Sequence, residues 1–253
     1  MHHHRQGSGS AIVLVHGIGS RLQVWRPVLD RLARHHDVIA LDLPGFGASA
    51  DDGGPGSVPH LADRVAAFLT GLGVERPAIG GSSLGGGVAL ELARRGVAGS
   101  VVAFSPVGFF SDRGAAWCRT VVTAARSTGA ALAPALPKLF ATRAGRVALC
   151  GVFYGRPGSL PPADCLADAR ALVAAPGFAA ARRSLGSWRL TGPIPDVPIT
   201  IAWGDRDLVL PYRQAARARE VLPHARHVRL AGCGHLPFAD DPATCARLLL
   251  EAA

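Results

Sequence analysis

The chain has 253 residues, 49% of them hydrophobic, so it is long enough and apolar enough to bury the core of one α/β domain. No apolar run approaches the roughly 18 residues that a membrane-spanning helix needs, and the first one is too short for a secretory h-region, so we expect a cytoplasmic protein without a membrane span. The net charge of +9 comes from arginines scattered along the chain, which is typical of solvated helix faces and argues against a nucleic-acid partner.

The cysteines and the N-terminus carry no predicted function. The five cysteines are odd in number and show no CxxC pair, so the sequence predicts neither a disulfide framework nor a zinc site. We expect no metal and no cofactor. Residues 1–10, which include His2, His3 and His4, are interpreted as a disordered N-terminus or part of a tag.

Strand and helix patterns alternate along the first hundred residues. Short apolar, β-branched runs that end in glycine loops predict strands at 11–15, 38–43, 77–80 and 100–104. Apolar residues at helical spacing predict helices at 23–34, 61–72 and 88–95. This alternation predicts a mostly parallel, doubly wound sheet, whose reactive residues lie at the carboxyl ends of the strands.

The pattern changes to successive helices between residues 106 and 195. Prolines and glycines separate predicted helices at 113–127, 138–153, 162–174 and 177–185. One crossover connection needs only about a dozen residues, so most of this segment is predicted to be a helical cap over the reactive edge of the sheet. The core is expected at 11–105 and 196–253, and its second part contains strands at 197–203 and 226–230 and helices at 212–221 and 242–251.

The stretch Gly81-Ser82-Ser83-Leu84-Gly85 joins a predicted strand directly to a predicted helix. This is the G-x-S-x-G pattern of a nucleophile elbow, in which a sharp turn raises the serine hydroxyl above the sheet. Glycine is needed two residues before and two residues after the serine, because side chains there would collide with the backbone. Ser83 meets this condition, whereas Ser82 is followed at that distance by Leu84, so we select Ser83 as the nucleophile.

A serine hydroxyl needs an imidazole to accept its proton, and the imidazole needs a carboxylate partner. His235 follows the glycines of a loop at the end of the last predicted strand. Asp205 and Asp207 both follow the strand that ends at Trp203, and the spacing alone leaves both open. Asp112, after the fourth strand, is a third and weaker candidate. The backbone N–H of Leu84 is expected to stabilise a developing oxyanion.

Five motifs in this order resemble the α/β-hydrolase superfamily. They are His16-Gly-Ile-Gly19, Asp42-Leu-Pro-Gly-Phe-Gly47, the serine elbow, Gly204-Asp-Arg-Asp207 and Gly232-Cys-Gly-His235, and the likeness covers residues 11–250. The resemblance implies that the catalytic acid is Asp207, with Asp205 capping the turn, and that the second oxyanion donor is the N–H of Ile18. It also implies that His16 supports its loop by hydrogen bonding and that the turn at Asp42 is structural.

The chain departs from this family at its start, because only about ten residues precede the first predicted strand. The family usually begins with two additional strands. The resemblance therefore implies a sheet of about six strands that lacks these two. The strand at 38–41 would then be an exposed edge, which favours pairing with a second copy as a homodimer.

Together these residues predict a cofactor-free serine hydrolase with a helical cap. It would cleave an ester-like bond (carboxylester, thioester, lactone or carbon–carbon) of a small, largely apolar substrate through an acyl-enzyme on Ser83. Two alternatives use the same residues. One is a perhydrolase or cofactor-free haloperoxidase, and the other is a small-molecule receptor that retains the triad.

Overall fold

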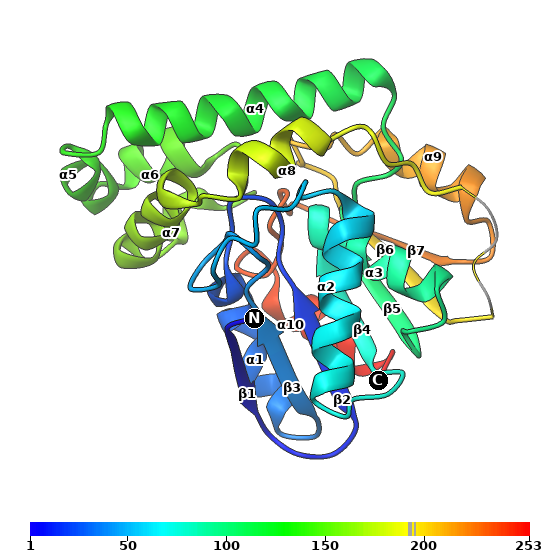
Figure 1. Ribbon diagram of the computed structural model, residues 1–253. Helices are drawn as coiled ribbons and strands as arrows, with labels where there is room; N and C mark the ends of the chain where they lie inside the picture. The colour runs from blue at the N-terminus through cyan, green and yellow to red at the C-terminus, as the bar shows by residue number, and fades with distance from the viewer. Residues whose placement is uncertain (192–193, 195) are drawn as a thin grey trace.

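The computed structural model describes residues 1–191, 194 and 196–253. Within these residues seven strands form one sheet in the order β1-β3-β2-β4-β5-β6-β7, and every pair is parallel except β1 with β3 (Figure 1). The strands are β1 (His3–Gln6), β2 (Ala11–Val15), β3 (Asp37–Leu41), β4 (Ala78–Ser82), β5 (Ser100–Phe104), β6 (Ile199–Gly204) and β7 (Arg226–Leu230). The predicted mostly parallel sheet is confirmed.

Helices cover both faces of the sheet, because the central strands are apolar on both faces. In β2, Ile12 and Leu14 pack with α1 (Arg26–Ala33) and α10 (Pro242–Leu250). Val13 and Val15 point to the opposite face and belong to the core formed with α2 (Val58–Gly71), α3 (Leu84–Arg94) and α9 (Gln214–Val221). A short 3-10 helix, η1 (Leu22–Trp25), precedes α1.

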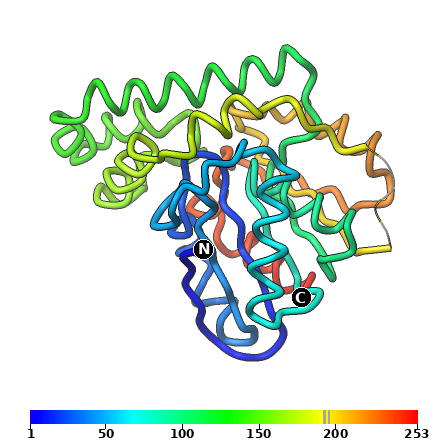
Figure 2. The backbone as a smooth tube through the Cα atoms, in the orientation of Figure 1, coloured from blue at the N-terminus to red at the C-terminus, as the bar shows by residue number. Residues whose placement is uncertain are grey.

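In the described part of the chain between β5 and β6 there are five helices. They are α4 (Asp112–Ala131), α5 (Leu136–Ala141), α6 (Arg143–Cys150), α7 (Pro162–Ala174) and α8 (Phe178–Ser184), with the 3-10 turn η2 (Pro157–Ser159) before α7. Figure 1 shows α4 along the top of the molecule, and α5, α6 and α7 grouped beneath its distal half, beyond the sheet. Figure 2 follows this excursion and the return of the chain to β6. The predicted boundary at residue 195 lies outside the described residues.

The single helix expected over 138–153 is two helices in the structure. Thr142 separates α5 from α6, because its backbone is extended (φ −91°, ψ 145°) and its hydroxyl accepts a hydrogen bond from the Gly145 N–H at 3.0 Å. This is a threonine N-cap, which starts a new helix. Among the described residues, no helix combines the length and the apolarity needed to cross a bilayer.

The expectation of a disordered N-terminus is wrong, because residues 3–6 form β1 and pair with β3. Arg5 holds this edge in place through hydrogen bonds to Asp37. Its Nε donates to Oδ1 at 2.9 Å and to Oδ2 at 3.1 Å, and its Nη2 donates to Oδ2 at 2.7 Å. His2 Nδ1 lies 2.8 Å from Oδ2 of the buried Asp42, and the His3 ring packs edge-on against Phe68.

The expected six-stranded sheet with an exposed edge at β3 is therefore also wrong. One of the two strands whose absence was expected is present, and it covers the edge of β3. The expected homodimer was inferred from a free edge at β3, and because β1 covers that edge, the inference no longer has support. The new edge strand is short and polar, two properties that discourage pairing with other chains.

Candidate active site

Ser83 is the single residue between the end of β4 and the start of α3. Its backbone has φ 55° and ψ −114°, a left-handed conformation that a non-glycine residue adopts only under constraint. Three hydrogen bonds impose it: the Ser83 N–H donates to the Phe104 carbonyl at 2.9 Å, and the Ser83 carbonyl accepts from the N–H groups of Val107 and Gly87, each at 3.1 Å. The strand-to-helix turn has the geometry that the sequence predicts for an elbow.

The two glycines that flank Ser83 are required by close backbone contacts. A Cβ on Gly81 would lie 2.3 Å from the Gly85 carbonyl oxygen. A Cβ on Gly85 would lie 2.2 Å from the Val15 carbonyl oxygen and 2.4 Å from that of His16. Both distances are far inside van der Waals contact, and the opposing atoms are backbone. The elbow can therefore pack against β2 only with glycine at these positions.

Gly85→Ala is expected to lower the free energy of unfolding by about 3 kcal/mol or more, because neither the added methyl group nor the opposing carbonyls can move aside. Gly71→Ala is the matched control. Gly71 is also helical, and a Cβ there would meet nothing within 4 Å. The control should be neutral or stabilising by up to about 1 kcal/mol. Urea unfolding of both variants measures the difference, and equal stabilities would contradict the packing argument.

The neighbouring Ser82 does not share the position of Ser83. Its side chain is completely buried at the end of β4, and its hydroxyl has no hydrogen-bond partner in the described part of the chain. Ser83, by contrast, lines the large cavity described below. The structure thus presents the hydroxyl of Ser83, and not that of Ser82, to a space that a ligand could occupy.

Asp207 and His235 meet in the loops that follow β6 and β7. His235 Nδ1 lies 2.8 Å from Asp207 Oδ2, and both side chains are buried. The other carboxylate oxygen, Oδ1, accepts hydrogen bonds from the N–H groups of Val209 at 2.9 Å and Leu210 at 2.8 Å, so the carboxylate is fixed. In a neutral imidazole whose Nδ1–H donates to Asp207, the other ring nitrogen, Nε2, has no proton and is able to accept one.

The two other candidate acids lie elsewhere. Asp205 accepts hydrogen bonds from Arg229 Nη2 at 2.9 Å and from the Gly232 N–H at 2.8 Å. It therefore holds the loop before His235 in place, and the imidazole is hydrogen-bonded to Asp207 instead. Asp112 begins α4, is fully exposed and pairs with Arg189 at 2.9 Å. Of the three aspartates, Asp207 alone is hydrogen-bonded to His235.

The loop after β2 lies beside Ser83. A Cβ on Gly17 would be 3.0 Å from Ser83 Cβ and 3.6 Å from its Oγ, and the next residue, Ile18, lines the same cavity. The N–H groups of Ile18 and Leu84 donate to no acceptor within the described residues. Leu84 is the first residue of α3, where N–H groups are free and the helix dipole favours negative charge.

His16 anchors this loop. Its Nε2 accepts a hydrogen bond from the Leu43 N–H at 3.0 Å, so its Nδ1 carries the proton and donates to the Gly17 carbonyl at 2.7 Å. The side chain is completely buried. Burial lowers the pKa of the imidazole below its usual value of 6.5, outweighing the hydrogen bond to Gly17 and the charge of Asp42. His16 therefore has a supporting geometry, with no ring nitrogen free for proton transfer.

The neutral state of His16 predicts a pH-dependent stability. Below about pH 6.5 the imidazole of the unfolded chain binds a proton that the folded protein does not bind, so the free energy of unfolding falls as the pH falls, by up to about 1.4 kcal/mol per pH unit. His16→Asn should be less stable at neutral pH and should lack this part of the slope, whereas His35→Asn, at an exposed site, should keep it. Urea unfolding between about pH 5 and 7 tests this. Equal slopes in wild type and His16→Asn would contradict it.

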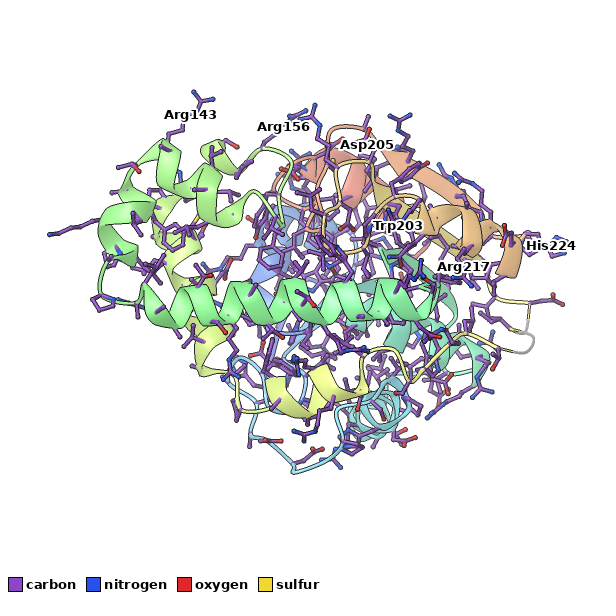
Figure 3. The ribbon with its side chains drawn as sticks, turned by 90° about the horizontal axis from the view of Figure 1, so that it is seen from above. Arg143, Arg156, Trp203, Asp205, Arg217 and His224 are labelled. Carbon is purple, nitrogen blue, oxygen red and sulfur yellow. The ribbon has the colours of Figure 1, made fainter. Side chains whose placement is uncertain are left out.

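A cavity of about 610 Å³ opens over Ser83 and His235, which both line it. Its walls come from the loop at residues 17–20, from the loop at 208–209 and from helices α4 to α7, and most of them are apolar. Seen from above, α4 lies across the middle of the molecule, with α8 on one side and the α5–α6 pair on the other (Figure 3). Within the described residues the Ser83 hydroxyl makes no hydrogen bond to His235, and such bonds often tighten only around bound substrate.

Asp240 is a positioning residue that the sequence did not single out for this role. Its Oδ2 accepts hydrogen bonds from the N–H groups of Gly234 at 2.9 Å and Gly155 at 2.7 Å, and its Oδ1 accepts one from Arg156 N–H at 2.8 Å. The residue before His235 is thereby tied to the segment after α6. The acidic residue shortly after His235 was visible in the sequence, but two of its three partners lie 84 and 85 residues away.

A parallel sheet with a strained serine between a strand and a helix, and an aspartate–histidine pair at the ends of later strands, defines the class of the α/β-hydrolases. The chain belongs to the alpha/beta hydrolase family, whose model matches residues 12–248. It is an enzyme, a hydrolase with esterase-like relatives.

The chain is 32% identical to an uncharacterized protein of Mycobacterium tuberculosis, over 94% of this chain and 73% of that protein. It is 29% identical to the pimeloyl-[acyl-carrier protein] methyl ester esterase of Xanthomonas axonopodis pv. citri, over 92% of this chain and 90% of the esterase. Its fold is similar to that of an esterase from Thermogutta terrifontis, with a TM-score of 0.77 and 22% identity over 99% of this chain and 91% of the other.

Proposed function

We propose that the protein is a cofactor-free serine hydrolase, with Ser83 as nucleophile, His235 as general base and Asp207 as the acid that orients it. The observation that carries this proposal is the buried 2.8 Å contact between Asp207 and His235 at the cavity that Ser83 also lines. The strained backbone of Ser83 supports the assignment, because the protein maintains that strain only through the contacts around the elbow.

In the proposed reaction, Ser83 Oγ attacks the carbonyl carbon of the substrate while His235 Nε2 takes the hydroxyl proton. The carbonyl oxygen becomes an oxyanion, for which the free N–H groups of Ile18 and Leu84 are the donors. His235 then gives its proton to the leaving group, and the acyl group stays on Ser83. A water molecule, activated by His235, releases the acid and restores the serine.

The cavity supports a proposal for the substrate class. Its walls are mainly apolar and its volume of about 610 Å³ lies in the range that holds small organic ligands. We propose that the helices between β5 and β6 act as a cap that encloses an apolar substrate with a carboxylester, thioester, lactone or activated carbon–carbon bond.

The cysteines are free thiols, which supports a reducing, cytoplasmic location.

Labelling with a fluorophosphonate probe tests this proposal, because such probes react with an activated serine. We expect one label, on Ser83, and steady hydrolysis of p-nitrophenyl acetate by the unlabelled protein. Labelling of Ser83 without steady turnover would instead support the small-molecule receptor. Turnover that depends on hydrogen peroxide would support the perhydrolase.

A further inference from the structure

The cavity is elongated and runs away from Ser83 beneath α4. The α4 residues that line it extend from Trp117 to Gly129 on one face of the helix, which at 1.5 Å per residue corresponds to about 18 Å. Trp117 marks the end nearer the catalytic loops, since its Nε1 donates to the carbonyl of Leu208, the neighbour of Asp207, at 2.9 Å. At the other end Gly129 faces α7, where a Cβ would lie 3.1 Å from Val173 Cγ2.

The wall formed by α7 carries a carboxylate with unused hydrogen-bonding capacity. Asp168 Oδ1 accepts hydrogen bonds from Arg21 Nη2 at 2.9 Å and Arg21 Nε at 3.2 Å, whereas Oδ2 accepts none within the described residues. The side chain is 42% accessible, yet burial raises its pKa above the usual value. Asp168 is one of the residues that line the cavity, so a ligand there could reach its free carboxylate oxygen.

Tyr154 supplies a second polar group on this part of the wall. It lines the cavity together with Cys150 and Cys165, and its hydroxyl makes no hydrogen bond within the described part of the chain. Burial raises its pKa well above 10, and the charge of Asp168 adds to this effect, so the hydroxyl stays protonated and able to donate. Tyr154 packs against Cys165 and Ala169 of α7, the helix that carries Asp168, so its hydroxyl is a donor available to a ligand on this part of the wall.

We propose that the substrate carries a neutral hydroxyl group on an apolar chain, remote from the bond that Ser83 cleaves, and that this hydroxyl donates to Asp168 and accepts from Tyr154. A hydroxyl fits because it is both donor and acceptor. A neutral group fits better than an ammonium because Arg21 already compensates the charge of Asp168. This inference rests on the proposed serine hydrolase function and adds the chemistry at the far end of its substrate.

Kinetics of the wild-type protein on a matched series of p-nitrophenyl ester substrates test this inference without any variant. The series runs from butanoate to dodecanoate, and each length is made with a terminal methyl, a terminal hydroxyl and a terminal ammonium group. We expect kcat/KM to favour the hydroxyl over the methyl by about tenfold, only at the chain lengths that reach Asp168. A methyl preference at every length, or a preference for ammonium, would overturn the inference and leave the hydrolase intact. Failure to hydrolyse any ester would overturn the hydrolase as well.

A double variant tests whether Asp168 binds the hydroxyl group of the substrate. Arg21→Met/Asp168→Leu removes the whole ion pair, so no unpaired charge is left in the cavity wall. We expect the hydroxyl preference to fall by about tenfold, through loss of activity on the hydroxyl esters. Arg189→Met/Asp112→Leu is the control, since it removes another arginine–aspartate pair, from residues that do not line the cavity, and should keep the preference. An unchanged preference in the Arg21/Asp168 variant would refute the assignment of Asp168.

Discussion

Ser83→Ala is expected to reduce kcat for p-nitrophenyl acetate by about 10⁴-fold or more and to abolish fluorophosphonate labelling. The reason is chemical, because alanine has no atom that could form the acyl-enzyme. The fold should be unaffected by loss of one oxygen atom, since the hydrogen bonds that hold the elbow come from the backbone of residue 83. Circular dichroism and urea unfolding check that condition.

Ser82→Ala is the matched control for this prediction. It removes the same atom one residue earlier, from a buried hydroxyl that has no partner in the described structure, and should change kcat only a fewfold. If the Ser82 variant instead lost labelling and turnover while the Ser83 variant kept them, the nucleophile would be Ser82.

Asp207→Asn is expected to lower kcat by about 10⁴-fold without unfolding the protein. The amide oxygen of asparagine can still accept the hydrogen bonds from Val209 and Leu210. Its NH₂ group, however, would donate to His235 Nδ1 and leave the proton on Nε2. The imidazole would then be held in the tautomer that cannot take a proton from Ser83. Steady-state kinetics across the pH range measure the loss.

Asp205→Asn distinguishes the role of Asp205 from that of Asp207, which lies in the same loop. Asp205 contacts Arg229 and Gly232 rather than the imidazole, so this variant should retain kcat within a fewfold and lose only part of the loop's stabilisation. The reverse outcome, with a large loss in Asp205→Asn and a small one in Asp207→Asn, would reassign the acid.

The core of the fold was predictable because its signals are local. Residues 11–15 form a strand covered on both faces, and the sequence shows this as an uninterrupted apolar run. The glycines at 81 and 85 are likewise readable, because a strand-to-helix reversal around one serine leaves no room for side chains at those positions. The carboxyl-end rule then predicts that Asp207 and His235 converge, and the structure has them in contact.

The remaining features depend on contacts between distant residues. The segment His3–Gln6 lacks apolar alternation, and what holds it is backbone pairing with β3 and the ion pair between Arg5 and Asp37, 32 residues away. The polar groups of the cavity also depend on contacts between distant residues. Asp168 becomes part of the cavity wall only when α7 packs over the loop that contains Arg21. No local pattern encodes that packing.

The hydrogen bonds of Asp240 have a consequence for attempts to transplant new specificity onto this scaffold. The segment after α6 shares a carboxylate with the loop that carries His235. A chimera that exchanges the whole segment between β5 and β6 would also replace Gly155 and Arg156, whose backbone N–H groups hold Asp240 against the residue before His235. Grafts that retain Gly155 and Arg156 of the host should thus preserve turnover better than grafts that cut across them.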